Sequence, residues 1–178
     1  ENDYIEYNFI EKIKKLTSKP TRNKTYSLDK VDEIYKELET SDPLLLLFIK
    51  FVSYNFLRPV EVVRLKVKDI NLKEGTLTVR AKNKPHKTKI IPEILTKELN
   101  KLDLKNPEHY LFTPEGVGKW EREESGKRSY FGNRFNKVKK KLDIGSGYTV
   151  YSFRHTFITK LYRELRKQYS KSETENKV

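Results

Sequence analysis

The sequence predicts a mainly α-helical protein with a small antiparallel β-sheet, an α+β fold. Apolar residues recur at steps of three and four along most of the 178 residues, which is the spacing of one helix face. Alternation typical of strands is confined to Thr76–Ala81 and Lys89–Pro92, which flank a basic loop. The longest apolar run, Leu44–Ile49, is too short to span a membrane and indicates a buried helix segment. The length suits one domain with a short appendage.

The first 26 residues are predicted to lie outside the main domain. Apolar residues at helical intervals over Tyr4–Leu16 indicate the last helix of a preceding domain. Residues Thr17–Tyr26 are polar and contain Pro20, so we interpret them as a linker. The main domain is then expected to occupy residues 27–178.

Three helices are expected in the first half of the main domain. Ser27 is suited to cap a helix that ends near Glu39 and turns five apolar residues inward, namely Leu28, Val31, Ile34, Tyr35 and Leu38. Ser41-Asp42-Pro43 signals a second helix, which is apolar nearly all round to about Asn55 and should form the centre of the core. Pro59 restarts a short third helix.

Strands and loops are expected around the middle of the chain. Asp69–Gly75 is predicted to be a turn before the hairpin, and Ile94–Leu102 a helix after it. A short buried segment, Tyr110–Phe112, precedes a predicted loop over Pro114–Gly126, in which Trp120 is the one large apolar residue.

Two further helices are expected at the end. Ser129 starts the first, and Gly145–Gly147 separates it from the second. Thr149 can cap the second, whose apolar stripe consists of Val150, Phe153, Phe157, Leu161 and Leu165. The polar tail from Gln168 has no predicted structure.

The net charge of +13 is unevenly distributed. Five basic residues and no acidic one lie between Val79 and Ile91, and seven lie between Lys127 and Lys141. Such clusters are typical of a surface that binds a polyanion, most often nucleic acid, although a lysine-rich proteome also gives basic surfaces without that function. The chain has no cysteine, which excludes disulfides and thiolate metal sites and fits a cytosolic protein.

Several common functional signals are absent from the sequence. There is no signal peptide, internal repeat, Gly-rich phosphate loop or clustered set of metal ligands, and no hydrolase or kinase motif. The three histidines, His86, His109 and His155, are isolated from one another. The chain begins with Glu1 and contains no methionine, so we interpret it as a piece of a longer protein.

Two short polar patterns are candidates for binding a phosphate. Arg58 precedes the short third helix and Glu61 follows one turn later, a spacing at which the carboxylate can orient the guanidinium. Tyr151, Arg154 and His155 lie at i, i+3 and i+4, so they share a face beside the apolar stripe of the last helix. Simpler interpretations are a surface ion pair for the first pattern and a solvated helix face for the second.

These landmarks, taken in order, resemble the catalytic domain of the tyrosine recombinases, the phage integrase family. Leu57–Leu65 resembles the family's first box, whose Arg binds the scissile phosphate. Ser152–Thr159 resembles the second box, usually His-x-x-Arg-His-Thr. Val79–Lys82 followed by Lys89–Pro92 resembles the β-hairpin that carries the catalytic Lys. The resemblance covers about Ser27–Arg166 and implies the fold of that catalytic domain.

The resemblance implies a catalytic role for four residues. Arg58 and Arg154 would be the two phosphate-binding arginines. Lys82 would be the general acid, with Lys84 and Lys87 as alternatives because the hairpin loop looks longer than usual. Tyr151 stands where the family usually has His. Its phenol can hydrogen-bond a phosphate oxygen, but an unperturbed pKa of about 10 prevents it from serving as a base near neutral pH.

Supporting residues follow from the same resemblance. Glu61 is expected to orient Arg58, and the family's common Gly before Leu-Arg is replaced by Phe56. We expect DNA contacts from the remaining basic candidates, which are Lys84, Lys87, Arg134, Lys137 and His155. No metal or cofactor is expected.

The family's nucleophilic Tyr is expected to lie outside this chain. The family places it some way beyond a Gly-His or Gly-Trp box, but only 24 residues follow Arg154, and apart from the adjacent His155 they contain no His or Trp. Tyr162 and Tyr169 lie too early and are interpreted as structural. The resemblance thus makes residues 1–26 the end of a DNA-binding (core-binding) domain with its linker. Residues 27–178 would be the catalytic domain without its nucleophile segment.

The implied function is site-specific recombination of phage or other mobile-element DNA through a 3′-phosphotyrosine intermediate. This piece is expected to bind DNA without cleaving it. The expected partners are a double-stranded attachment site and, on that DNA, other copies of the protein in a tetramer, with a monomer in isolation and no membrane. The expected location is the cytoplasm, at the nucleoid. The alternatives are a non-catalytic DNA-binding relative with the same fold, or an unrelated basic nucleic-acid-binding module.

Overall fold

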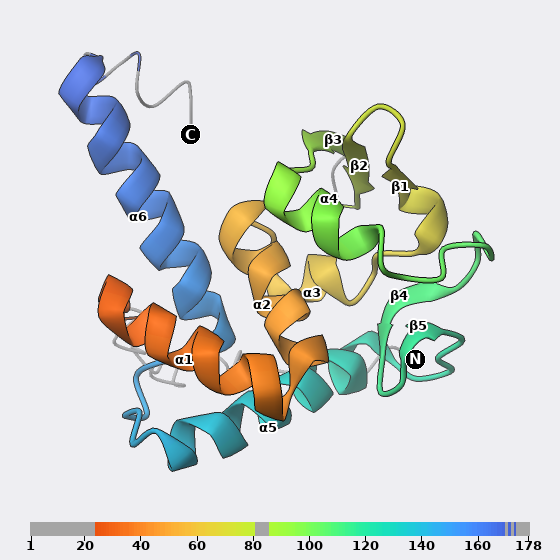
Figure 1. Ribbon diagram of the computed structural model, residues 1–178, viewed down its shortest axis with the longest axis horizontal. Helices are drawn as coiled ribbons and strands as arrows, with labels where there is room; N and C mark the ends of the chain where they lie inside the picture. The colour runs from red at the N-terminus through yellow and green to blue at the C-terminus, as the bar shows by residue number, and fades with distance from the viewer. Residues whose placement is uncertain (1–23, 81–85, 170, 172, 174–178) are drawn as a thin grey trace, which may run out of the picture.

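The computed structural model describes residues 24–80, 86–169, 171 and 173. This part of the chain is mostly helical and carries two small antiparallel sheets, which confirms the predicted α+β class (Figure 1). None of the helices in these ranges is both long enough and apolar enough to cross a bilayer. The predicted helix over residues 4–16 and most of the predicted linker lie outside the described residues.

The first two helices begin at the predicted caps. The Ser27 hydroxyl accepts a hydrogen bond from the Lys30 backbone N–H at 3.3 Å, and α1 runs over Leu28–Ser41. Asp42 caps α2, Pro43–Tyr54, by accepting from the backbone N–H of Leu45 at 3.0 Å. The prediction that Leu28 points inward is wrong. Its side chain is 46% exposed, because it lies one turn before the packed face of α1 begins.

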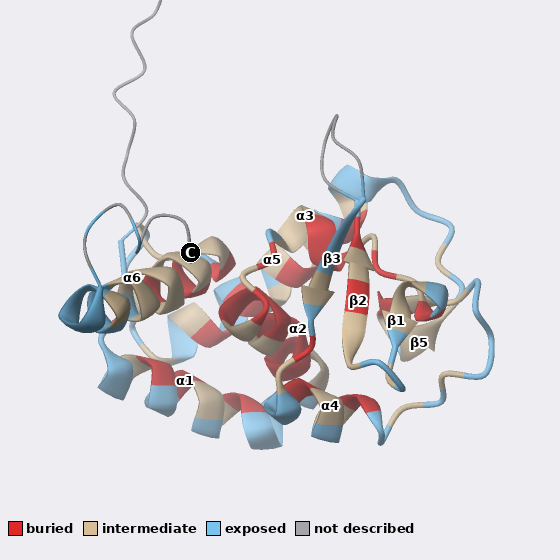
Figure 2. Cartoon of the chain, turned by 90° about the horizontal axis from the view of Figure 1, so that it is seen from above, coloured by how far each residue is buried: buried red, intermediate tan, exposed pale blue. Residues whose placement is uncertain are grey.

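The core is built around α2, which Figure 2 shows as a largely buried element between the other helices. It packs against α1, α5 and α6, against the short α3 (Pro59–Val62), and against α4 (Glu93–Leu99). Phe48 is fully buried and stacks on Phe131 of α5 with ring centroids 4.2 Å apart. Such burial on every side agrees with the all-round apolar character of the segment.

A three-stranded antiparallel sheet follows the 3-10 helix η2, Val67–Asp69. Its order is β1 (Ile70–Asn71), β2 (Thr76–Val79) and β3 (Lys87–Ile90). The prediction of a plain turn over residues 69–75 missed the short β1. The last strand also begins and ends two residues earlier than predicted, and Pro92, which lacks an N–H, is the N-cap residue of α4.

The predicted loop over residues 114–126 contains a strand and the first turn of a helix. Strand β4, Tyr110–Thr113, pairs with β5, Gly116–Gly118, and α5 spans Glu124–Lys141, so it begins five residues earlier than predicted. Ser125 and Gly126 are weak helix formers and concealed this first turn. Tertiary contacts stabilise it, since the amine of buried Lys127 lies 3.3 Å from the Tyr110 ring centroid.

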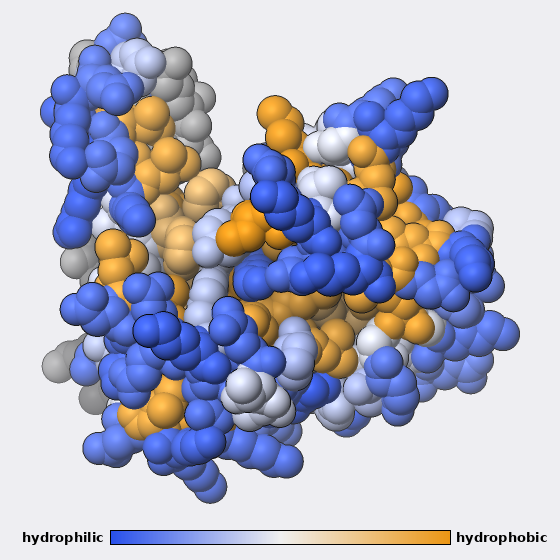
Figure 3. Space-filling view, viewed as in Figure 1, coloured by the Kyte–Doolittle hydropathy of each residue, from blue (hydrophilic) through white to orange (hydrophobic). Residues whose placement is uncertain are grey.

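The last helix, α6 (Val150–Gln168), packs its first half on α2. Its second half extends away from the body (Figure 1), and the space-filling view shows hydrophilic and hydrophobic residues side by side on it (Figure 3). Tyr26 was predicted to belong to the linker but is buried against this helix. Its N–H donates to the Thr156 hydroxyl at 2.8 Å, and its ring lies 4.5 Å from that of Phe153.

Candidate active site

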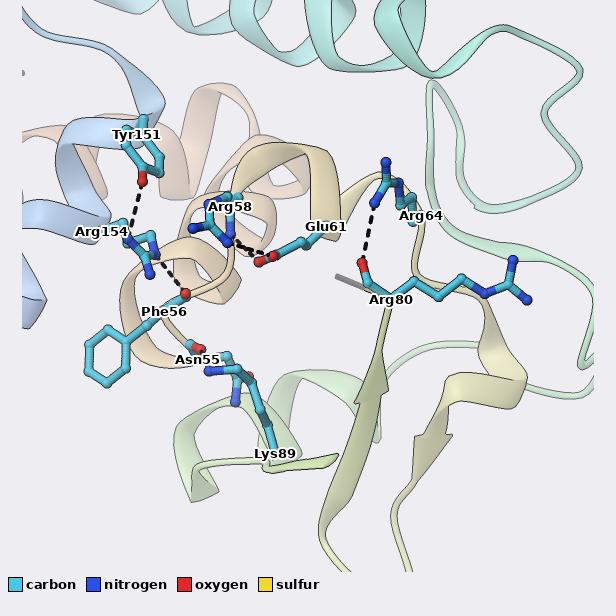
Figure 4. Close-up of polar contacts among 9 residues, drawn as sticks. All are labelled: Asn55, Phe56, Arg58, Glu61, Arg64, Arg80, Lys89, Tyr151 and Arg154. Carbon is cyan, nitrogen blue, oxygen red and sulfur yellow. Dashed lines mark hydrogen bonds and ion pairs between the residues drawn. The ribbon is translucent and has the colours of Figure 1, made fainter. Parts of the chain in front are cut away.

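The candidate site is organised by the turn that follows α2. Asn55 ends the helix, and Phe56 takes a left-handed conformation with φ of +53°. A bulky residue rarely adopts this conformation, and glycine adopts it freely. The family that the sequence resembles commonly has glycine at this position, and the positive φ explains that preference. The turn leaves the Phe56 carbonyl pointing toward α6 (Figure 4).

Arg58 follows this turn as the N-cap residue of α3. Glu61, which is buried, accepts from the Arg58 backbone N–H at 2.7 Å and from its Nη1 at 3.0 Å. The hydrogen bond and the negative charge of Glu61 raise the pKa of Arg58. The Arg58 side chain remains 55% exposed. Glu61 therefore orients the guanidinium, as its spacing predicted, while leaving it open to solvent.

Arg154 reaches the same turn from α6. Its Nε donates to the Phe56 carbonyl at 2.8 Å, and its Nη1 donates to the Tyr151 hydroxyl at 3.2 Å. Tyr151 also lies close enough to Arg58 to contribute to the raised pKa of that residue. The two arginines and the phenol therefore meet at one place, although they come from opposite ends of the described chain (Figure 4).

The start of α6 is fixed by its cap. Thr149 is the N-cap residue, and its backbone N–H donates to the Ser152 hydroxyl at 3.0 Å. The Tyr151 and Arg154 side chains are carried by the first turns of this helix, where the helix dipole adds positive potential. Two guanidiniums with planar forks, a phenol and a helix N-terminus together suit an anion with tetrahedrally arranged oxygens.

His155 stacks edge-on against the Tyr151 ring, with centroids 4.6 Å apart. Burial, followed by the charge of Arg154, lowers the pKa of His155. The imidazole is therefore neutral at neutral pH and adds no positive charge to the site. It supports the placement of Tyr151, and its predicted DNA contact stays a prediction.

The predicted hairpin lysines are only partly placed. Lys82 and Lys84 lie outside the described residues. Lys87 is described in β3, where it lies opposite Val79 and is exposed. Lys137 is exposed on α5. Their roles in DNA contact or proton donation stay predictions.

Arg134 is held within the protein. Its side chain turns inward from α5 to Asp42, and its Nε donates to Oδ2 of that residue at 2.6 Å, so its predicted DNA contact stays a prediction. The Tyr130 hydroxyl takes a further hydrogen bond from Nη1 at 3.3 Å. Burial of this pair and its hydrogen bonds leave Arg134 as a link between α5 and the start of α2.

The sequence alone missed two basic residues beside the site. Lys89 of β3 donates from Nζ to the Asn55 carbonyl at 3.1 Å. Arg64 binds both oxygens of Glu124, and its Nη1 donates to the Arg80 carbonyl at 3.2 Å, which fixes the end of β2 (Figure 4). A signal existed for Lys89, because strand alternation places it opposite buried Leu77 and on the inward face.

Within residues 24–80 and 86–169, no three His, Cys, Asp or Glu side chains lie close enough together to hold a metal ion. The residues that meet at the turn after α2 are two arginines and a phenol, which are hydrogen-bond donors suited to an anion.

Comparisons with known proteins identify the family and the fold. The family model described as the phage integrase family matches residues 24–167. The structure is similar to that of XerA recombinase, with a TM-score of 0.61 and 22% identity over 85% of this chain and 54% of that one. It is also similar to a lambda integrase dimer bound to a COC′ core site, with a TM-score of 0.68 and 17% identity over 97% and 49% of the two chains.

A third similar structure is that of the Tn1549 transposon integrase in complex with transposon right end DNA. Its TM-score is 0.63, with 10% identity over 96% of this chain and 61% of that one. No curated protein sequence matches the chain. The chain spans about half to three fifths of the length of these structures, and at these identities the likeness shows the fold. Because the family model matches most of the chain, we conclude that it belongs to the phage integrase family, the tyrosine recombinases.

Proposed function

We propose that this chain is the catalytic portion of a site-specific DNA recombinase, an integrase of a phage or other mobile element. The observation that carries the proposal is the meeting of Arg58 and Arg154 at one turn, joined by Tyr151. Phosphoryl transfer to a tyrosine needs no water or metal ion, but it does need positive donors around the phosphate. The DNA-bound integrases among the similar structures support the choice of DNA as the partner.

The two arginines would hold the scissile phosphate. A guanidinium presents two parallel donors to the nonbridging oxygens, and fixing it beforehand avoids reorganisation during the reaction. Arg154 is fixed by the Phe56 carbonyl, and Arg58 by Glu61. Tyr151 would add a neutral hydroxyl donor to one phosphate oxygen, in the position usually held by His in the family.

A lysine of the β2–β3 hairpin would protonate the departing 5′-oxygen. We retain Lys82 for this role, with Lys84 and Lys87 as alternatives. An ammonium suits the role because it is attracted to the phosphate and can donate a proton to a poor leaving group. The bond from Arg64 to the Arg80 carbonyl supports this assignment, since it fixes the strand that leads into the hairpin.

The nucleophilic tyrosine would come from a segment outside this chain. Tyr162 lies eight residues beyond Arg154 on α6, which places it roughly 12 Å further along the helix axis. Tyr169, the residue that ends α6, is further still. We therefore propose that the 178-residue chain binds DNA without cleaving it, and that residues 27–178 are the catalytic domain preceded by the end of a core-binding domain.

The DNA partner would be a double-stranded attachment site. Exposed Lys87 and Lys137 would contact phosphates along the duplex, and such contacts make affinity fall steeply as salt rises. On paired sites the protein would act as a tetramer and in isolation as a monomer. Its place of action would be the cytoplasm, at the nucleoid.

The test uses the natural full-length protein and a nicked suicide substrate that carries its attachment site. Wild type should form a covalent protein–DNA adduct, and Arg154→Ala should slow its formation by about 10²–10³-fold while duplex binding persists. Tyr151→Phe should still form the adduct, because the nucleophile lies elsewhere. Adduct formation by Arg154→Ala at the wild-type rate would overturn the proposal. A wild-type protein that binds the site but never forms an adduct would instead be the non-catalytic relative.

A further inference from the structure

We propose that Lys89 is a positioning residue of the recombinase site: together with Asn55 it docks strand β3 against the end of α2 and places a positive charge beside Arg154. This inference rests on the proposed function. It adds Lys89 to the two arginines and the general-acid lysine already assigned to the site. It is carried by the contacts of the turn after α2, which Figure 4 shows with Lys89 approaching from β3.

Asn55 and β3 are joined by two hydrogen bonds that run in opposite directions. The Asn55 side-chain amide donates to the Ile90 carbonyl at 2.7 Å, and Lys89 Nζ donates to the Asn55 carbonyl at 3.1 Å. Asn55 takes part in both bonds and is 4% exposed, so water has little access to its atoms. A reciprocal pair of this kind fixes both the position and the register of the strand relative to α2.

The same turn spaces Lys89 from Arg154. Lys89 binds the Asn55 carbonyl, while Arg154 Nε binds the next carbonyl in the chain, that of Phe56, at 2.8 Å. Both carbonyls lie at the C-terminal end of α2, where the helix dipole favours cations. The left-handed conformation of Phe56 separates the two carbonyls so that each accepts from a different element. One turn therefore sets the relative places of β3 and α6.

The charged groups that act on Lys89 include two residues of the site, Glu61 and Arg154. Burial lowers its pKa, the charge of Glu61 on α3 opposes this, and the charges of Arg154 on α6 and Lys87 on β3 add to it. Lys89 thus lies within electrostatic reach of Arg154 and of Glu61, the residue that orients Arg58. An ammonium has three N–H donors, and the Asn55 carbonyl accepts one of them.

Asn55 also has an acceptor that the protein does not use. Among the described residues, its Oδ1 is the one buried side-chain polar atom without a hydrogen-bond partner. Such an orphan destabilises a fold and calls for a reason to be retained. Here an amide is required to donate to Ile90, and its spare oxygen lies on the residue that Lys89 contacts. This pattern suits a junction whose polar geometry serves the site.

The experiment measures single-turnover adduct formation by the full-length protein on the nicked substrate, alongside duplex affinity and thermal stability. Lys89→Met should slow adduct formation roughly 10- to 100-fold, because small displacements at a reacting centre have effects of this size. Duplex affinity should change less than about twofold, since a half-buried lysine makes few contacts along the backbone. Lys89→Arg should recover part of the rate, because it keeps both a donor and the charge.

Two lysine controls separate this effect from general ones. Lys97→Met removes an exposed lysine of α4, paired to Glu93, and should leave the rate unchanged. Lys50→Met removes a half-buried lysine of α2 that pairs with Glu98 at 2.7 Å, so it should lower stability while the folded protein still reacts at the wild-type rate.

The outcomes are distinguishable. Failure of wild type to form an adduct overturns the proposed function itself. An active wild type with Lys89→Met at the same rate, or with a loss that only follows duplex affinity or the stability loss of Lys50→Met, overturns this inference alone. If Lys89→Met does not fold, Lys89→Gln replaces it. That variant keeps an N–H donor without the charge, and a wild-type rate for it shows that the charge beside Arg154 is not needed.

Discussion

Two arginine–carboxylate pairs in this molecule are built from the same parts and have opposite consequences. Each lies at a helix start with proline in the first position, Asp42-Pro43 at α2 and Arg58-Pro59 at α3. At α2 the carboxylate is the cap, and Arg134 reaches it from another helix. At α3 the arginine is the cap residue, and Glu61 reaches back to support it.

The two arrangements differ in what is left over for a ligand. The Arg134 side chain is 22% exposed, with donors bound to Asp42 and Tyr130, whereas the Arg58 side chain is 55% exposed and only its Nη1 is tied to Glu61. The sequence resemblance made Arg58 a candidate for binding the scissile phosphate and Arg134 a candidate for contacting DNA. We therefore propose that Arg58, with its greater exposure, is a ligand of the phosphate and that Arg134 is a structural residue.

The largest expected effect concerns the Arg58–Glu61 pair, whose arginine is exposed. Arg58→Ala should slow covalent adduct formation by about 10²–10³-fold, because a fixed donor to the phosphate is lost. Its effect on the free energy of unfolding should be smaller than that of Arg134→Leu, because buried Glu61 keeps its hydrogen bond from the backbone N–H of residue 58 and the Arg58 side chain itself is half exposed. The suicide-substrate assay and urea unfolding measure the two quantities. A large loss of stability with an unchanged rate would reverse the roles assigned to the two pairs.

The Arg134–Asp42 pair, whose arginine is mostly buried, should respond in the opposite way. Arg134→Leu should lower the free energy of unfolding by about 2–3 kcal/mol, because it leaves the Asp42 carboxylate without its partner. Below the unfolding temperature, the adduct rate should be unchanged. Adding Asp42→Asn should restore part of the stability, because the amide keeps the cap acceptor without the charge. If the single variant keeps its stability and loses DNA cleavage, Arg134 belongs to the site.

The turn between the pairs should show a smaller effect. Phe56→Gly relieves a left-handed conformation but makes the unfolded chain more flexible, so the free energy of unfolding should change by less than about 1 kcal/mol. Phe56→Val should destabilise by about 1–2 kcal/mol, because a β-branched residue is poorly accommodated at positive φ. Urea unfolding of the two variants checks this. Equal stability of the two would show that the turn carries no such strain.

The smallest expected effect concerns pH. The pKa of His155 is lower in the folded protein than in the unfolded chain, so the unfolded state binds the proton more readily. Its contribution to stability is therefore complete above the unfolded pKa of about 6.5 and is lost as pH falls through that value toward the lower folded pKa. Between pH 7.5 and 5.5, wild type should lose more stability than His155→Asn. Parallel losses in the urea midpoint would assign the change to other groups.

Sequence reasoning captured what is local. The spacings of Arg58 to Glu61 and of Tyr151 to Arg154 gave contacts that the structure contains, because three residues make one helical turn. The caps at Ser27 and Asp42 were recognised for the same reason. Helix α2 was identified as central from its apolar character alone.

What escaped prediction depends on pairings across the chain. Arg134 and Asp42 are 92 positions apart, and nothing near either residue indicates the other. Lys89 reaches Asn55 only because the hairpin folds back along α2. Lys127 resembles an exposed lysine in sequence, yet it is buried over the Tyr110 ring and helps to start α5 five residues early. The sequence indicated the left-handed turn only through Phe56, which replaces the family's common glycine. The role of the turn follows from the hydrogen bond between the Phe56 carbonyl and Arg154.

We propose that Arg58 and Arg154 form one anion site. The most direct measurement is anomalous diffraction from crystals of this chain soaked in tungstate, a tetrahedral anion with phosphate-like oxygens. We predict a tungstate peak between the two guanidiniums, within hydrogen-bonding distance of the Tyr151 hydroxyl, and its loss in Arg154→Ala crystals. Tungstate bound on α5 near Lys137 with none between the arginines, or a peak that persists in the variant, would show that Arg58 and Arg154 do not form one anion site.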